Sequence, residues 1–573
     1  MAGRDITEGR AERAIAVDIG IVSDGTIWQN TNEFYDVAIG GLPFIYAIND
    51  DRPYIRQTAP FKKEQFDNAA EPGEQSLTGW WIRSQMSFHS GTGIKFYDPA
   101  TTDEVGHYRF SDSKGVNVWT KGQVTLLKSC TEGHATTGPV ATNGSVQQHL
   151  RSIKWGTDSG VLLHDEYDVD KIPVDAPGTP VHFIDYNAGT DSPVYAICDD
   201  GTFAYWITNT ATKKTVYKKA LTGVAGAGDV VMFDEIGAVA NATMEYVKDR
   251  IILCADNKVY EFATSATALP TPVYTHPTTT HVYTSITASG PAIYIAGYNG
   301  IQSTIQKFTL DTAGIMPTLT SAVVAAELPV GEIVYKIYYY LGYMMIGTNK
   351  GIRVAVISDQ DGSVTYGPLV VETDQPCYDF AARDHFVWCA TSVSGEPGVI
   401  RVDLGNELEP LRFAYANDIY YSGITGHETT ACAFADTDGT NRLAFATTAV
   451  GAADGAVYVE DASDLIATGY ITTGNIRYGT LEPKNFKRLL ARGDYTYGSM
   501  VLETVDKNGV EYDHITYDSG ISPIEITTSS PSTAQEYVAY KFILNRDATT
   551  VSSGPIFKGY QAKATIATPR QRI

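Results

Sequence analysis

Between Val124 and Tyr470 the chain repeats one pattern of apolar and polar positions, with a period of roughly fifty residues. Each copy has an almost entirely apolar segment, a polar turn, and a second segment in which apolar and polar residues alternate. The first segment is typical of a strand inside a stacked sheet, and the second of a half-exposed strand. Seven copies can be aligned: SGVLLHDEYDV, SPVYAICDDGTFAYWI, DRIILCADNKVYEF, PAIYIAGYNGIQSTIQKF, GYMMIGTNKGIRVAVI, HFVWCATSVSGEPGVIRVDL and NRLAFATTAVGAADGAVYVED.

This repeat predicts an all-β fold built around a β-propeller, in which four-stranded sheets form the blades of a ring. The turns carry glycine where a hairpin needs a positive φ angle, as in Asp199-Asp200-Gly201 and Asn299-Gly300. We expect about seven blades over residues 123–473, with one blade fewer or one more as the alternatives. The repeat does not indicate how the ring closes.

The region before the repeat, residues 1–122, has short apolar segments such as AIAVDIGIV and long polar stretches. Long loops in a compact domain are usually functional or ordered by a partner, so we expect a β-rich docking region here. Adjacent tryptophans on a strand point to opposite faces, and an outward tryptophan next to arginine is a typical interface anchor. The alternative is that the loops of this region cover both tryptophans. The candidate docking residues are Phe61, Phe66, Trp80, Trp81 and Arg83.

The region after the repeat, residues 474–573, alternates again but without the blade pattern, which predicts a separate β-sandwich. The segment PKNFKRLLARGDY, residues 483–495, is the clearest candidate for a short helix.

Composition and charge narrow the function. The formal net charge of −23 disfavours nucleic acid and anionic membrane surfaces as partners. No apolar run is long enough to cross a bilayer, and the first residues lack the apolar core of a signal peptide. We expect buried free thiols in a protein made in a reducing cytoplasm, because the six cysteines are dispersed and lie mostly in apolar segments. They are Cys130, Cys198, Cys254, Cys377, Cys389 and Cys432.

The chain contains few sequence patterns that are typical of enzymes. The serine-hydrolase elbow, the P-loop, the dinucleotide fingerprint and the H-E-x-x-H motif do not occur. The acidic run from His164 to Asp170 has the residue types of a glycosidase carboxylate pair, but adjacent acids in one loop usually face water. The segment Tyr338-Tyr339-Tyr340 has the rings of a sugar cleft, yet alternation places the middle ring on the other face and part of the run in the core.

The histidines are too scattered for a metal centre. Asp436, Asp438 and Asn441 form a weak calcium-loop pattern, which is equally typical of a hairpin turn. We therefore expect no enzymatic activity, no cofactor and no catalytic residues.

Several whole segments resemble minor tail proteins of long-tailed phages that infect actinobacteria. They are YDVAIGGLPFIYAINDDRPY, FKKEQFDNAAEPGEQSLTGWWIRSQMSFHSGTGIKFYDP, RFSDSKGVNVWTKGQVTLL and LEPKNFKRLLARGD. The resemblance covers residues 34–127 and 474–494 and is only architectural elsewhere.

The resemblance implies a structural protein of the virion, made in the host cytoplasm and assembled in several symmetric copies at the tail tip or baseplate. Its implied partners are other tail-tip proteins and, on the exposed side, a host cell-surface glycan or protein. The N-terminal region would dock onto the tail, and the propeller would serve as an adaptor or a receptor binder. The alternatives are a tail-associated glycan hydrolase and a cellular propeller scaffold; an exposed propeller face serves an adaptor and an adhesin equally.

Overall fold

The computed structural model describes residues 37–39, 42–49, 52–57, 81–97, 106–136, 149–165, 167–186, 193–209, 213–236, 239–391, 398–418, 427–437, 440–449, 455–518, 524–527, 531 and 533–567. These residues form strands and turns, with one short 3-10 helix, η5, at Gly106–Tyr108. None of their helices has the length and hydropathy that crossing a membrane requires. The predicted all-β class is confirmed.

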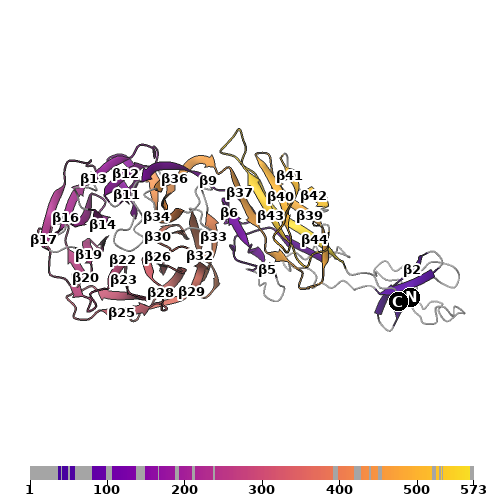
Figure 1. The fold of residues 1–573 in the computed structure, drawn as a ribbon, viewed down its shortest axis with the longest axis horizontal. Helices are drawn as coiled ribbons and strands as arrows, with labels where there is room; N and C mark the ends of the chain where they lie inside the picture. The colour runs from indigo at the N-terminus through magenta and orange to yellow at the C-terminus, as the bar shows by residue number, and fades with distance from the viewer. Residues whose placement is uncertain are drawn as a thin grey trace.

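Seven four-stranded antiparallel sheets are arranged around one axis as a β-propeller, seen as a ring in Figure 1. The predicted number of blades is therefore confirmed. In six blades the strands follow one another along the chain. Around most of the ring the first strand of a blade contacts the first strand of the next, which places these strands around the axis; between blades 1 and 2, the first strand of blade 2 contacts the second strand of blade 1.

The strands of blades 1 to 3 are β10 (His149–Trp155), β11 (Asp158–Asp165), β12 (Asp168–Pro173) and β13 (Val181–Asp185); β14 (Val194–Asp199), β15 (Phe203–Asn209), β16 (Lys213–Ala220) and β17 (Val230–Ile236); β18 (Ala242–Val247), β19 (Arg250–Ala255), β20 (Lys258–Phe262) and β21 (Tyr274–Thr275). Blades 4 to 6 comprise β22 (Val282–Ser289), β23 (Ala292–Asn299), β24 (Gln302–Thr309) and β25 (Val323–Glu327); β26 (Val334–Tyr340), β27 (Tyr343–Thr348), β28 (Gly351–Ile357) and β29 (Val364–Glu372); β30 (Asp379–Arg383), β31 (Phe386–Ala390), β32 (Val399–Glu409) and β33 (Arg412–Asp418).

A strand from the start of the propeller sequence completes the seventh blade. β34 (His427–Thr437), β35 (Thr440–Ala449) and β36 (Gly455–Leu465) follow in order, and β9 (Lys128–Thr136) is the fourth strand, antiparallel to β36. The two ends of the propeller sequence thus share one sheet. Backbone hydrogen bonds between them close the ring.

Side chains reinforce this closure between blade 7 and blade 1. Nε2 of His134, on β9, lies 3.0 Å from Oδ2 of Asp170, on β12. The other carboxylate oxygen, Oδ1, lies 2.7 Å from Nδ1 of His182 on β13. Asp170 is almost fully buried, so both of its oxygens are engaged where water is largely excluded.

The propeller core lies between blades. Seven clusters of buried apolar side chains each combine residues of two neighbouring blades. A strand in the middle of a blade is covered on both faces, which explains why β19 and β23 are nearly all apolar and buried. Every blade thus depends on its neighbours for burial of apolar surface.

The second domain is a β-sandwich made from residues on both sides of the propeller in sequence. One sheet has the strand order β41-β40-β43-β37-β6 and the other β4-β44-β39-β42. A single core cluster includes residues of both sheets, such as Phe542 and Phe557, whose ring centroids are 4.3 Å apart. Its strands are β4 (Trp81–Gln85), β6 (Asp112–Lys114), β37 (Thr468–Thr472), β39 (Lys484–Asp494), β40 (Ser499–Val505), β41 (Glu511–Tyr517), β42 (Ile524–Thr527), β43 (Ala539–Asn545) and β44 (Ile556–Ile566).

Smaller sheets complete the fold. β5 (Phe96–Tyr97) pairs in parallel with β38 (Asn475–Ile476), and β7 (Val116–Asn117) pairs with β8 (Thr125–Leu126). A three-stranded sheet, β1 (Val37–Ile39), β2 (Leu42–Asn49) and β3 (Arg52–Gln57), lies beyond the sandwich on the side away from the propeller (Figure 1).

Two expectations about the domains are wrong. Residues 81–97 and 106–122, expected in a separate N-terminal docking region over residues 1–122, do not form one, because β4 and β6 pair with β44 and β37 and so complete the C-terminal sandwich. The expected helix in residues 483–495 is instead β39, which pairs with β44 on one side and β42 on the other. Tertiary pairing overrides its helical pattern. The segment AIAVDIGIV lies outside the described residues.

The sandwich contacts the propeller at blade 6. The backbone N–H of Thr92 donates to the carbonyl oxygen of Tyr415, on β33, at 2.8 Å, and Nδ2 of Asn406 donates to the carbonyl oxygen of His89 at 3.1 Å. Gly91 has φ of 79°, and a Cβ there would lie 2.5 Å from the Tyr415 oxygen. Only glycine fits this close approach.

We predict that residues 127–466 fold as an isolated propeller, and that the shorter fragment 138–466, which lacks β9, is strongly destabilised. Removing β9 deletes the backbone ladder with β36, and each net hydrogen bond contributes about 1 kcal/mol. The loss should therefore amount to several kcal/mol and a clearly lower midpoint in urea unfolding. Equal midpoints for the two fragments would show that β9 does not hold the ring closed.

Candidate functional site: the central channel of the propeller

A cavity of about 620 Å³ lies in the central channel, and the innermost strand of every blade contributes to its wall. Because each blade places its first strand at the axis, residues far apart in sequence meet here. The lining residues are 150–152, 199, 245–248, 286–288, 336–338, 379–382 and 432–434.

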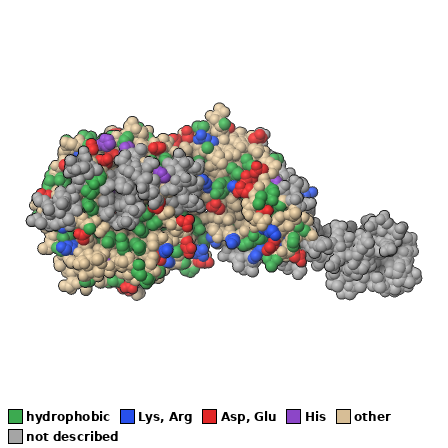
Figure 2. Space-filling model, viewed as in Figure 1, with side chains coloured by type: hydrophobic (Ala, Val, Ile, Leu, Met, Phe, Trp, Pro, Cys, Tyr) green, Lys and Arg blue, Asp and Glu red, His purple; other side chains and the backbone are tan. Residues whose placement is uncertain are grey.

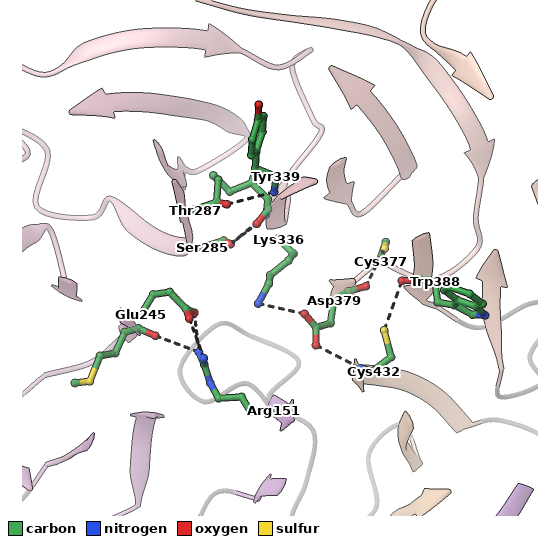
Figure 3. Close-up of polar contacts among 12 residues, drawn as sticks. Arg151, Glu245, Ser285, Thr287, Lys336, Tyr339, Cys377, Asp379, Trp388 and Cys432 are labelled. Atoms are coloured by element: carbon green, nitrogen blue, oxygen red, sulfur yellow. Dashed lines mark hydrogen bonds and ion pairs between the residues drawn. The ribbon is translucent and has the colours of Figure 1, made fainter. Parts of the chain in front are cut away.

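An ion pair connects blades that are not neighbours. Arg151 extends from β10 in blade 1 to Glu245 on β18 in blade 3, past blade 2 (Figure 3). Its Nη1 lies 2.8 Å from Oε1 and its Nη2 lies 2.6 Å from Oε2. The side chains are 17% and 27% exposed, so water screens this bidentate contact only in part.

The electrostatics of the pair keep both partners charged. Burial alone would raise the pKa of the Glu245 carboxyl, but the Arg151 guanidinium outweighs burial and holds that pKa below its usual range. Likewise, burial alone would lower the pKa of Arg151, and Glu245 more than compensates. A third acid of the cavity, Asp199, accepts a hydrogen bond from the backbone N–H of Gly201 at 3.1 Å, and burial raises its pKa.

A second ion pair joins the opposite side of the ring. Nζ of Lys336, on β26, lies 3.1 Å from Oδ1 of Asp379, on β30. The other oxygen of Asp379 accepts a 3.3 Å hydrogen bond from the backbone N–H of Cys432, on β34. The Cys432 thiol donates to the carbonyl oxygen of Trp388 at 3.6 Å (Figure 3). One carboxylate thus links blades 5, 6 and 7.

Hydroxyl groups make the corresponding link between blades 4 and 5. Oγ of Ser285 accepts from the backbone N–H of Ile337 at 3.1 Å and donates to the carbonyl oxygen of Ile337 at 3.2 Å. The backbone N–H of Tyr339 donates to Oγ1 of Thr287 at 3.2 Å (Figure 3). Polar side chains on the inner strands therefore satisfy backbone groups of the adjacent blade.

This geometry bears on the possibility of glycoside hydrolysis, which uses two carboxyl groups whose pKa values are pushed apart. Asp199 and Glu245 have pKa shifts in opposite directions. However, Arg151 holds both oxygens of Glu245, so this carboxylate is not free to act as a nucleophile or base. What the channel offers is a set of paired charges that connect the blades, with aromatic rings such as Tyr338 and Phe380 in the wall.

Two of the five candidate docking residues are buried, which corrects the expectation that they are surface anchors. Trp81 is 6% exposed and stacks on Tyr478 at 5.8 Å. Arg83 is fully buried; its guanidinium lies 3.3 Å from the centre of the Tyr97 ring, and its Nε donates to Tyr560 Oη at 3.2 Å. Both belong to β4, which is the edge strand of its sheet and is buried along its whole length. Phe61, Phe66 and Trp80 lie outside the described residues.

The acidic run departs at its two ends from the solvated turn that the sequence predicts. Its ends, His164 and Asp170, are buried: Nε2 of His164 lies 2.7 Å from the carbonyl oxygen of Val194, and Asp170 contacts two histidines. The β11–β12 hairpin places both side chains between blades. These two side chains thus support the ring.

The calcium-loop pattern falls on a hairpin. Asp436 and Asn441 are backbone partners at the end of β34 and the start of β35, as expected for the alternative interpretation. Asp438 and the side chain of Asp436 lie outside the described part of the chain. Within that part, no group of three or more His, Cys, Asp or Glu side chains is placed to hold a metal ion.

Other predictions about side chains are confirmed. The six cysteines are free thiols; five are buried and Cys130 is partly buried. Tyr338 and Tyr340 lie on one face of β26, with ring centroids 6.2 Å apart, whereas Tyr339 packs into the core between blades 4 and 5.

The channel residues were missed because the repeat was aligned on other strands. Six of the seven aligned copies cover the second and third strands of a blade, whereas Arg151, Glu245, Lys336 and Asp379 lie on first strands. The available signal was a charged residue within a short, otherwise mostly apolar or small segment, as in ATMEYV and DFAAR. Only the ring brings these residues together.

The chain's own strand pairing thus defines a seven-bladed β-propeller protein with a discontinuous β-sandwich. No protein-family model matches the chain, and no curated protein matches it. Similar solved structures include the WD40 propeller domain of Doa1 (TM-score 0.38, 10% identity, 58% of this chain and 98% of that one) and YCF48 bound to D1 peptide (0.39, 11%, 58% and 96%). Another is the PQQ-bound aldose sugar dehydrogenase of Streptomyces coelicolor (0.33, 10%, 48% and 98%).

We predict that Arg151→Met destabilises the protein by about 2–3 kcal/mol at neutral pH, because Glu245 is left as a largely buried, unpaired charge. The double variant Arg151→Met/Glu245→Gln should recover most of this loss. Since the folded-state pKa of Glu245 lies below its ordinary value of 4.5, the stabilisation is present above that value and is lost as pH falls through the folded-state pKa.

Urea unfolding of the wild type and both variants at several pH values measures this effect. The gap between wild type and Arg151→Met should be largest above about pH 5 and shrink in more acidic buffer. A gap that is absent, or that does not change with pH, would contradict the account of the channel.

Proposed function

We propose that the protein is a structural component of the tail tip of a long-tailed phage, in which the sandwich attaches the chain to the tail and the propeller serves as an adaptor or receptor binder. The propeller fold is compatible with such a binding role. The tail assignment is supported by the resemblance of residues 34–127 and 474–494 to minor tail proteins.

The observation that carries the proposal is that these two resembling regions fold together. Strand β4, from the first region, and strand β39, from the second, pair with opposite sides of β44. Residues 81–97, 106–126 and 484–494 thus build one sandwich although the whole propeller separates the first two segments from the third in sequence. A shared attachment module is expected to stay similar while the part that meets the environment varies.

The junction between the domains supports a projecting propeller. Oδ1 of Asp112 accepts from Nδ2 of Asn417, on blade 6, at 3.2 Å, and Oδ2 accepts from Tyr470 Oη at 3.0 Å. Together with the contacts at Gly91, this fixes the propeller on the sandwich. A rigid connection transmits a binding event or a pull from one domain to the other.

The surface is suited to a protein present in several copies. Acidic side chains are spread over the propeller and the sandwich on the face shown in Figure 2, in keeping with the net charge of −23. Like charges keep crowded copies soluble. Several copies on one tail convert weak single contacts into firm attachment through a high effective concentration.

The propeller can be excised to test the assignment of roles. The backbone N–H of Ile466 donates to the carbonyl oxygen of Leu127 at 3.0 Å, so a short Gly-Ser linker can replace residues 128–465. In a phage that lacks its own copy of the gene, we expect the propeller-less chain to enter particles. The isolated propeller, residues 127–466, should remain free.

Immunoblots of purified particles give the result, and circular dichroism confirms that each fragment is folded. Incorporation of the isolated propeller, or exclusion of a folded propeller-less chain, would contradict the proposal.

A further inference from the structure

A second cavity, of about 490 Å³, lies between blades 3 and 4, away from the central channel. Three connecting segments form it: the one before β18, the turn from β19 to β20, and the one before β22. In the part of the chain that the structure describes, its lining and that of the channel cavity have no residue in common. The lining residues are Val239, Ala240, Asn241, Asp256, Asn257, Thr279, Thr280, His281 and Val282.

His281 is the unusual member of this lining. It is 3% exposed, yet neither ring nitrogen has a hydrogen-bond partner among the residues that the structure describes. The ring stacks on His276 at 4.0 Å and meets the edge of Tyr283 at 4.6 Å. Gly297 makes room for it, since a Cβ there would lie 2.6 Å from Nε2. A buried donor and acceptor without partners are costly and point to a ligand that supplies them.

The charge state of His281 limits what that ligand is. Burial, and secondarily His276, lower the pKa of His281 to about 4. At neutral pH the ring is therefore uncharged and has one N–H donor and one nitrogen acceptor. A hydroxyl group both donates and accepts, so it complements either nitrogen.

The rest of the lining has the same neutral, polar character. Oδ1 of Asp256 accepts from the backbone N–H groups of Ala240 at 2.8 Å and Asn241 at 3.1 Å, and Nδ2 of Asn257 donates to the carbonyl oxygen of His276 at 2.7 Å. These bonds fix the loops in place. Among the described residues the lining contains no lysine or arginine, and its one acid disfavours an anion.

Exposed apolar side chains follow, two residues along the chain or through one backbone hydrogen bond, from a residue that contacts the cavity lining. Oγ1 of Thr280 donates to Oδ1 of Asn299 at 2.9 Å, and two residues further on Ile301 is 63% exposed. The carbonyl oxygen of Ile301 accepts from Gly331 at 2.8 Å, next to Val330, which is 72% exposed. Polar groups inside and apolar side chains at the edge match the two faces of a sugar ring.

We propose that this cavity binds a neutral, hydroxyl-rich molecule, a monosaccharide unit or polyol, with a hydroxyl group hydrogen-bonded to His281. The inference does not rest on the proposed tail function.

Saturation-transfer difference NMR on the full chain tests the proposal with glucose, galactose, mannose, arabinose and glycerol as probes, and with glucuronate as the anionic comparison. We expect at least one neutral probe to bind with Kd of about 1 mM, and His281→Phe to bind it about tenfold more weakly, as the loss of one hydrogen bond predicts. Asn241→Ala should also weaken binding. Gln302→Ala, which lies outside the cavity lining, should bind like the wild type.

The phenyl ring of His281→Phe keeps the aromatic packing, and thermal melts check that this variant folds. If it does not fold, binding by Asn241→Ala decides the outcome. Absence of a signal from every neutral probe would overturn the proposal. So would equal binding by the wild type and the folded cavity variants, or a preference for glucuronate.

Discussion

The hydrogen bond between Leu127 and Ile466 marks the point at which the chain leaves the sandwich for the propeller and returns to it. Because exit and return lie side by side, β9 and β36 are positioned to pair, and their pairing closes the ring. The same geometry lets strands from before and after the propeller meet across β44. The chain thus leaves the sandwich and returns to it at the same place. This one constraint allows both the closed propeller and the discontinuous sandwich to form.

The two domains are stabilised in different ways. The sandwich, with its buried Trp81 and Arg83, is held by a core that needs both parts of the chain. The propeller is held by clusters between blades and by ion pairs in its channel, such as Arg151–Glu245. Most charged side chains in its channel form ion pairs with one another. The open features lie elsewhere on the propeller, including the cavity around His281 and the edge formed by Ile301 and Val330.

The sequence predicts those parts of the fold that depend on local pattern. All-apolar strands followed by alternating ones, with glycine at the turns, were sufficient to infer seven blades. The ring closure by β9 was not predictable, because strand pairing across more than three hundred residues has no local signature. β39 resembles a helix in isolation, and its two neighbours in the sheet decide otherwise. Trp81 and Arg83 suggest an interface in sequence, and their burial follows only from the long-range pairing of β4 with β44.

In the proposed function, the sandwich holds the chain in the tail while the propeller faces outward. A cryo-EM map of intact phage particles that carry this gene, focused on the tail tip, tests it most directly. The account predicts density for several copies, each with the sandwich against neighbouring tail proteins and the propeller projecting towards the outside. A particle without the protein, or one in which the propeller is enclosed and the sandwich exposed, would contradict it.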